Sequence, residues 1–470
     1  MEWSQKFTVK IKRSSKKLAL ACQRSPSRSK IQDMDRTLIC ETPKKVNEKI
    51  KIEGWVNVVR DHGKITFIDL RDRTGVIQCV GTNLPKVSSE FVIEVVGKIV
   101  NRPEKLVNKN IETGSVELQI EELKVLAKSE ELPIDMGKED LEVELPTLLD
   151  WRSLTLRHNK VKSIFKVQAK IAEGFRKAAI ELGCTEIFVP TIAASATEGG
   201  AEVFKVKYYE HDAYLTQSPQ LYKQMLVPVF ERVFTIAKAY RAEPSVTTRH
   251  LSEATQMDCE LAFVNFEELM DALEFVGSST LKYAERECKE ELKLFKVPKL
   301  KIPIKIPRLK MREAQEIIYK RIGVDHRNEK DLEPEDEREI CRWALEEKNS
   351  DLITITHYPT KKRSFYTKPD PENPEFSLSF DLLFRGVEIL SGSQRINEYS
   401  ELVKEIKDRG MNPDNFEMYL QAFKFGMPPE GGFSFGLERL TMKILELANV
   451  REASLFPRDM QRVDMRLSSI

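Results

Sequence analysis

The fold is decided by a glycine-rich stretch that runs directly into an apolar segment, Gly431-Gly432-Phe433-Ser434-Phe435-Gly436-Leu437-Glu438-Arg439. The apolar residues that follow recur at helical spacing, which predicts an amphipathic helix beginning near the last glycine. Glycines before a helix N-terminus let the backbone approach an anion or a flat ligand closely. A glycine-rich stretch is also typical of a plain turn, so this one needs support from elsewhere in the chain.

Support comes from two arginines that lie about 190 residues earlier. Arg241 belongs to a Tyr-Arg-Ala-Glu run, and Arg249 follows eight residues later, beside His250 and Leu251. The polar residues between the arginines predict two strands joined by a long loop, so both guanidinium groups could face one cavity. Arginine suits phosphate because its planar fork donates two parallel hydrogen bonds. The plainer interpretation is a pair of surface ion pairs.

Two further segments add groups that a nucleotide site needs. Residues 381–395 contain Glu388, Ser391 and Arg395, and residues 217–223 contain Gln220 and Lys223. A carboxylate such as that of Glu388 is a candidate ligand for a hard cation. The four segments together supply cations and a carboxylate, but their spacing alone does not show that they converge.

Composition excludes several other classes of protein. The chain has 470 residues, with 75 Lys+Arg against 74 Asp+Glu, a formal net charge of +1. No apolar run approaches the roughly 18 residues that a membrane span needs, so we expect no membrane association. The seven cysteines are odd in number and form no CxxC pair. This argues against a disulfide scaffold and the usual zinc site, and favours reduced thiols in the cytoplasm.

The first 33 residues differ from the rest in charge. Basic and serine residues dominate them, and Glu2 is the one acidic residue before Asp33. Such an arm is predicted to be disordered and attracted to phosphates. A dispensable tail, a true start at Met34 and a transit peptide are alternatives that the sequence leaves open.

Residues 34–128 predict a small β-barrel. Five short runs rich in β-branched residues are separated by turn signals, as in closed barrels. Alternation along one run places Ile68 and Leu70 inside and Phe67 outside, beside charged groups. An outward ring next to basic residues suits stacking on an unpaired base, and packing against a neighbouring domain is the equal alternative.

The remainder of the chain predicts a hinge and one larger domain. Residues 129–157 are polar and proline-punctuated, and helical periodicity begins near residue 158 and ends at Gly183. The domain then runs from 158 to 470, with a helical insertion around 267–350. The charge run at 325–339 within this insertion is predicted to be a solvated helix face and its preceding loop.

These segments resemble the class II aminoacyl-tRNA synthetases, and among them the aspartyl-tRNA synthetases of archaeal and eukaryotic type. The resemblance covers residues 34–462 and leaves out the basic arm. It implies an α+β protein, with an OB-fold β-barrel that binds the anticodon before a catalytic domain built on an antiparallel sheet flanked by helices. The matching segments are 182–192 (motif 1, at a dimer interface), 240–243 with 249–251 (motif 2), 432–439 with 454–459 (motif 3), 196–200 (a loop over the amino acid), 380–395, 425–429, and in the barrel 54–56, 60–61 and 67–72.

The resemblance also implies a role for each candidate residue. The catalytic groups would be Arg241, Arg439 and Glu388. The other expected positions are listed by ligand: for ATP, Arg241, Glu243, Arg249, His250, Leu251, Glu388, Gly436, Leu437, Glu438 and Arg439; for aspartate, Glu198, Gln220, Lys223, Arg241, Ser391 and Arg395; for Mg²⁺, Glu388 and Ser391; for the anticodon, Arg60, Phe67 and Gln78.

The implied function is aspartate–tRNA ligase, a cytoplasmic homodimer that uses ATP and Mg²⁺ to attach L-aspartate to tRNA(Asp). Two cations, Lys223 and Arg395, would meet the side-chain carboxylate, and asparagine would leave them poorly paired. Lys223 could instead merely pair with a nearby carboxylate such as Asp258. The alternatives are an enzyme that also charges tRNA(Asn), an asparaginyl-tRNA synthetase, and a non-catalytic paralogue that binds RNA.

The sequence departs from the family pattern at one adenine-binding position. Ala254 stands where many members of the family have a phenylalanine that stacks on adenine.

Overall fold

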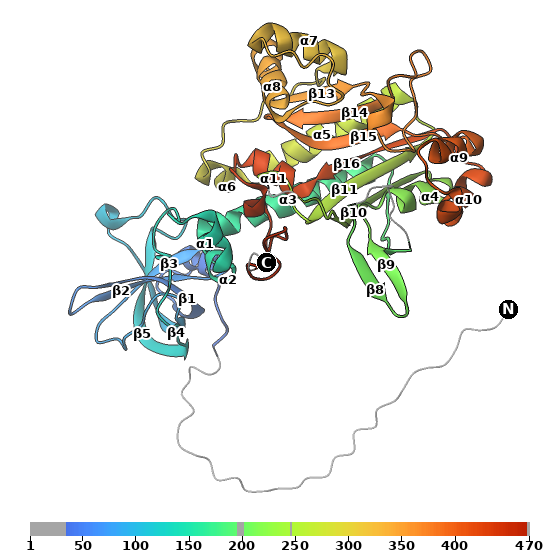
Figure 1. Ribbon diagram of the computed structural model, residues 1–470. Coiled ribbons are helices and arrows are strands. Elements are labelled where there is room, and N and C mark those ends of the chain that lie inside the picture. Colours follow the sequence, from blue (N-terminus) through green and yellow to red (C-terminus); the bar gives the residue numbers. More distant parts are fainter. Residues whose placement is uncertain (1–33, 195–201, 245–246, 468–470) are drawn as a thin grey trace, which may run out of the picture. The chain divides into compact units, whose positions relative to one another are not determined.

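The computed structural model describes residues 34–194, 202–244 and 247–467. The chain divides into two compact units, with the boundary between Lys138 and Glu139 (Figure 1). Within these described residues no helix combines the length and apolar character that crossing a bilayer requires.

The first unit is a closed barrel with strand order β1-β2-β3-β5-β4. Its strands are β1 (Lys49–Asp61), β2 (Thr66–Arg71), β3 (Val76–Gly81), β4 (Val92–Asn101) and β5 (Val116–Ala127). The β-branched runs therefore form the five predicted strands. Ile68 and Leu70 are fully buried in the barrel core, whereas Phe67 lies half-buried on the outer side, as strand alternation requires.

The second unit is built on an eight-stranded sheet of order β12-β13-β14-β15-β16-β11-β10-β6. Pairing is antiparallel as expected, except that β6 is parallel to β10 and β12 is parallel to β13. The strands are β6 (Thr185–Glu186), β10 (Arg232–Tyr240), β11 (Glu253–Ala262), β12 (Arg308–Lys310), β13 (Leu352–Thr356), β14 (Ser379–Phe384), β15 (Val387–Gln394) and β16 (Glu430–Gly436). A smaller sheet joins β7 (Ile192–Ala193), β9 (His211–Leu215) and β8 (Lys205–Tyr208).

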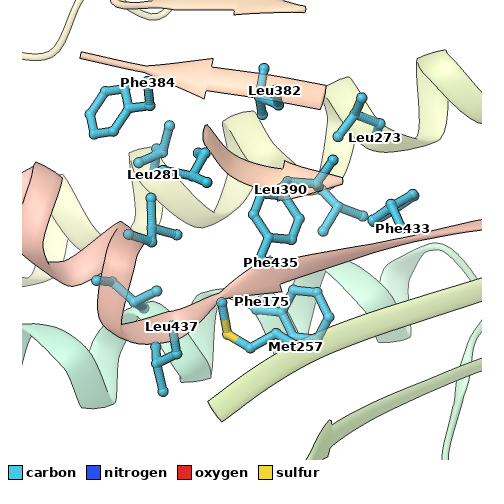
Figure 2. Packing of buried hydrophobic residues seen from close by; sticks show 14 of the residues in the cluster. Phe175, Met257, Leu273, Leu281, Leu382, Phe384, Leu390, Phe433, Phe435 and Leu437 are labelled. Carbon is cyan, nitrogen blue, oxygen red and sulfur yellow. The ribbon is translucent and has the colours of Figure 1, made fainter. Parts of the chain in front are cut away.

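Helices α3 (Asn159–Glu181), α5 (Phe266–Glu287) and α11 (Leu437–Ile444) enclose the main core against this sheet. Figure 2 shows Phe175 of α3 beside Met257 and Phe435 of the sheet. Gly183 follows α3 with a φ of +85°, as its predicted role after the helix requires. The other helices are α1 (Leu145–Asp150), α2 (Arg152–Thr155), α4 (Gln220–Phe230), α6 (Lys289–Leu294), α7 (Met311–Ile322), α8 (Pro334–Lys348), α9 (Tyr399–Asp408) and α10 (Glu417–Lys424).

Strand alternation gives the sheet one apolar and one polar face. In β11, Met257 and Cys259 enter the core under the helices, while Gln256 and Asp258 line a cavity on the other face. The neighbouring strand β16 repeats the pattern, since Ser434 pairs with Asp258 and also lines the cavity. The period-2 rule therefore places polar side chains in one cavity and apolar ones in the core.

Two expectations, one about the hinge and one about the insertion, need revision. Helices α1 and α2 lie within the segment 129–157 that was predicted to be an extended hinge. The insertion at 267–350 is not purely helical, because it contributes β12 to the main sheet.

The interpretation of the charge run at 325–339 as a solvated helix face and its preceding loop holds for residues such as Glu335 and Arg338, which are exposed, but is wrong for three acidic residues. Asp336, Glu337 and Glu339 of α8 are all buried. Each has a cationic or potentially cationic partner, namely His326, Arg249 and Arg321 in turn. Paired charges tolerate burial, which a count of charges along the sequence does not reveal.

Two glycines of the stretch 431–439 do not have the ligand-binding role that the sequence predicted. Gly431 and Gly432 lie inside β16, where an added Cβ would come within 2.5 Å of Leu269 and 2.1 Å of Glu260. Their lack of a side chain makes room for protein neighbours and not for a ligand. Gly436 alone of the three immediately precedes α11 and lines the cavity.

Candidate active site

Most of the predicted nucleotide and amino-acid ligands line a single cavity of about 320 Å³. They are Gln220, Lys223, Arg241, Glu243, Arg249, His250, Leu251, Glu388, Ser391, Arg395, Gly436, Glu438 and Arg439. Leu437 is the exception among the described residues, since its side chain belongs to the core. Glu198 lies outside the described residues.

The loop between β10 and β11 brings two arginines to the cavity. Arg241 follows β10 directly and keeps 43% of its side chain exposed. Among the described residues, its side chain has only a distant carboxylate contact, 3.9 Å from Glu243. Arg249 bonds Glu337 at 2.5 Å through Nη1. Arg241 is therefore the less constrained of the two cations.

His250 is set up as a neutral hydrogen-bonding group. Its Nδ1 lies 2.7 Å from Thr247 Oγ1. Burial and the adjacent charge of Arg439 lower the pKa of His250 below its ordinary value. The imidazole is consequently uncharged at neutral pH and leaves charge neutralisation to the arginines.

Arg439 in the first turn of α11 joins two parts of the cavity wall. Its Nε donates to the Arg249 carbonyl at 3.2 Å and its Nη1 to the Glu388 carbonyl at 3.3 Å. The neighbouring Glu438 accepts the Thr255 backbone N–H at 2.9 Å, which ties α11 to β11. Arg439 Nη1 also lies 3.6 Å from a carboxylate oxygen of Glu388, so an ion pair balances part of the Arg439 charge, and the side chain stays 24% exposed in the cavity that it lines.

A buried charge cluster forms another part of the cavity wall. Lys223 is 1% exposed and lies 2.8 Å from Asp258 and 3.0 Å from Glu260. Burial alone would lower the pKa of Lys223, but the two carboxylates outweigh it and raise the pKa above its ordinary value. Arg395 donates from Nε to Glu260 at 2.7 Å. The pairing of Lys223 with Asp258 therefore exists, yet the lysine also lines the cavity.

This cluster retains hydrogen-bonding capacity for a ligand. Two ion pairs leave one of the three Lys223 donors without a partner among the described residues. Gln220 is buried, and its Nε2 has no hydrogen-bond partner there either. An unsatisfied buried donor is costly, so a bound acceptor would be favoured here.

Oxygen groups suited to a hard cation gather on β14 and β15. Asp381 and Ser391 are paired across the two strands, and Asp381 Oδ1 is buried without a hydrogen-bond partner. Burial and the nearby Asp381 charge raise the pKa of Glu388 to about 7. A cation would relieve both the repulsion and the unsatisfied oxygen, although no three acidic, histidine or cysteine side chains converge in the part of the chain that the structure describes.

The predicted anticodon residues share the outer face of the barrel. Arg60 is paired with Phe67 across β1 and β2, and Asp69 with Gln78 across β2 and β3. Arg60 forms a bidentate bond to Asp69, with both distances 2.8 Å. The Phe67 ring packs edge-on against His62, with centroids 5.7 Å apart. A half-exposed ring beside a guanidinium provides a stacking surface.

Several cavity residues were not among the predicted ligands. Arg363 lines the cavity, donates to Asp381 at 2.6 Å and to Ser391 at 3.3 Å, and lies 3.9 Å from the Tyr358 ring centroid. It stands in a stretch without clear periodicity, so no sequence signal marked it. The other unpredicted lining residues include Ser218, Gln256, Asp258, Ser364, Tyr366, Thr367 and Ser379.

Comparison with known proteins supports this organisation. Residues 144–460 match the family model described as tRNA synthetases class II (D, K and N), and residues 50–126 match the OB-fold nucleic acid binding domain. The chain is 40% identical to an aspartate–tRNA(Asp/Asn) ligase of Deinococcus radiodurans, over 92% of this chain and 99% of that one. It is 40% identical to an aspartate–tRNA(Asp) ligase of Pyrococcus abyssi, over 88% and 96%.

A solved structure of a tRNA synthetase has a similar fold. Asparaginyl-tRNA synthetase from Pyrococcus horikoshii, complexed with asparaginyl-adenylate, matches with a TM-score of 0.84 and 30% identity, over 91% of this chain and 99% of that one. The cavity, the sheet and the sequence comparisons thus agree. The chain belongs to the class II tRNA synthetase family (D, K and N) and carries an OB-fold nucleic-acid-binding domain ahead of its catalytic domain.

Proposed function

We propose that the chain is an aspartate–tRNA ligase, which forms aspartyl-adenylate from ATP and L-aspartate and then charges tRNA. The single observation that carries this proposal is that two buried cations, Lys223 and Arg395, line the same cavity as the arginines expected to bind phosphate, which are Arg241, Arg249 and Arg439. The relatives named aspartate–tRNA ligase, at 40% identity, support it.

Positioning and charge neutralisation account for the first step. The aspartate α-carboxylate attacks the α-phosphorus of ATP, and pyrophosphate leaves. Arg241 and Arg439 would bind the α-phosphate and offset the charge that develops on its oxygens, as preorganised cations do. The substrate carboxylate is itself the nucleophile, so no protein nucleophile or general base is required.

We further propose that Glu388 and Ser391 hold Mg²⁺. The raised pKa of Glu388 and the unsatisfied Asp381 oxygen beside it fit a hard cation with oxygen ligands. When bound, the ion would supply additional positive charge to the phosphates. The protein side chains around it would still orient the triphosphate.

The free hydrogen-bond donors of the cluster also favour aspartate over asparagine. Lys223 and Arg395 are already balanced by Asp258 and Glu260 in a fully buried cluster. A substrate side-chain carboxylate would accept from the remaining Lys223 donor and from the unsatisfied Gln220 amide. An asparagine side chain has one acceptor oxygen where the carboxylate has two, so its NH2 group would face one of these donors and leave it unpaired, which costs more than one lost bond.

The barrel face would read the anticodon, with Phe67 stacking on a base and Arg60 and Gln78 supplying polar contacts.

We infer a homodimer through motif 1, because Ile180, Phe188 and Ile192 expose large apolar surfaces in and beside that segment. The cysteines are free in the described parts of the chain, which fits a reducing cytoplasm.

The second candidate is a non-discriminating enzyme that also charges tRNA(Asn), as the name of the Deinococcus relative indicates for that protein. The test is aminoacylation of tRNA(Asp) and tRNA(Asn) transcripts with labelled aspartate. Charging of tRNA(Asp) alone supports the discriminating form, and charging of both supports the second candidate. Failure to charge either transcript would refute the proposal.

A further inference from the structure

Helix α8 places one buried carboxylate against the wall of the active-site cavity. Glu337 stands in the first turn of α8, and its residue surface is 8% exposed. It does not line the cavity itself. The sequence does not distinguish Glu337 from its neighbours in a run of charged residues. Other members of the run, such as Glu335, are exposed.

The Glu337 carboxylate contacts two elements that contribute residues to the cavity wall, Arg249 and Glu388. One oxygen accepts Arg249 Nη1 at 2.5 Å. The Glu388 backbone on β15 also lies close enough to the carboxylate to act against the rise of the Glu337 pKa that burial causes. Glu337 therefore links the motif 2 loop to the strand that carries the candidate cation ligand.

The bond leaves most of the Arg249 guanidinium available. Only Nη1 is bonded within the described residues, so Nε and Nη2 retain their donors. An unrestrained arginine loses much rotamer freedom on binding a ligand, and fixing it beforehand removes that cost. The bond from Nη1 to the carboxylate holds the guanidinium in place, and Arg249 still lines the cavity with Nε and Nη2 unbonded within the described residues.

We propose that Glu337 is a positioning residue for the first step, which holds Arg249 ready for the β- and γ-phosphates of ATP. This inference rests on the proposed function, since it assigns Arg249 to the pyrophosphate end of ATP. Glu337 acts through Arg249 and does not touch the substrate. The second step, in which the adenylate no longer carries these phosphates, has no use for the contact.

The test compares the two half-reactions in Glu337→Gln, which keeps the shape and removes the charge. In ATP–pyrophosphate exchange we expect the KM for ATP and for pyrophosphate to rise about tenfold or more, the loss typical of one charge-assisted hydrogen bond. The KM for aspartate should stay within about twofold. Transfer from preformed aspartyl-adenylate to tRNA should keep its wild-type rate. Glu337→Ala should show the same split with a larger effect.

Glu339→Gln is the matched control. Glu339 is buried on the same helix, but its partners Arg321 and Arg342 do not line the cavity. It should leave both half-reactions unchanged, whatever its effect on melting temperature. The proposal is overturned if Glu337→Gln leaves the KM for ATP unchanged or lowers it, or if both half-reactions fall equally. Absence of aspartate-dependent exchange in the wild-type protein would instead refute the proposed function.

Discussion

Replacing Lys223 with methionine separates the structural from the catalytic role of the buried charge cluster. The change removes an ammonium that lies 2.8 Å from Asp258 and 3.0 Å from Glu260. Glu260 keeps Arg395 as a partner, whereas Asp258 keeps only the Ser434 hydroxyl at 3.1 Å. Removing one partner of a buried ion pair lowers the free energy of unfolding by about 3–5 kcal/mol. Because Glu260 keeps its Arg395 contact, we expect a loss of about 3 kcal/mol for this variant.

The double variant Lys223→Met/Asp258→Asn provides the internal control. Asparagine removes the unpaired charge and still accepts from Ser434, so most of the lost free energy of unfolding should return. Aspartate-dependent ATP–pyrophosphate exchange should fall at least about a hundredfold in both variants, because neither offers the lysine donor to the substrate carboxylate. Calorimetric melting and the exchange assay measure the two effects. Full exchange activity in either variant, or a double variant as unstable as the single one, would refute this reasoning.

Three other changes test separate parts of the proposal. Arg439→Ala should abolish exchange, by at least about a hundredfold, while the hydrodynamic mass stays that of the wild type; equal activity would remove motif 3 from the chemistry. Phe67→Ala should weaken tRNA charging about 5- to 100-fold, the worth of one stacked base, and spare exchange; loss of both would contradict the division of labour. The apparent affinity for Mg²⁺ should be constant above pH 7 and fall up to about tenfold per unit below it, because protons compete for Glu388, whose pKa is raised to about 7. A flat Mg²⁺ titration from pH 6 to 8 would exclude Glu388 as a ligand.

Local patterns were sufficient to predict much of the fold. The alternation around Phe67 and Ile68 predicted which residue faces the barrel core, and the five strands formed where β-branched runs were bounded by turns. The apolar spacing that ends at Gly183 likewise predicted α3. These features depend on neighbours within a few residues, which a sequence shows directly.

The unpredicted features depend on contacts between distant segments. Glu337 is buried because Arg249, 88 residues away, pairs with it. Gly432 lacks a side chain because Glu260 from another strand occupies that space. Arg363 lines the cavity and donates hydrogen bonds to Asp381 and Ser391 of two neighbouring strands. Charge runs and glycines carry no mark of which distant partner will meet them, so their interpretation required the structure.

The central claim is that one cavity selects aspartate and activates it with ATP. The most direct measurement is ATP–pyrophosphate exchange by the wild-type protein with Mg²⁺, comparing aspartate and asparagine as the amino acid. We expect exchange with aspartate at saturating concentration and at least about a hundredfold lower kcat/KM with asparagine. Exchange that is faster with asparagine, or absent with both, would contradict the assignment of Lys223 and Arg395 to the substrate carboxylate.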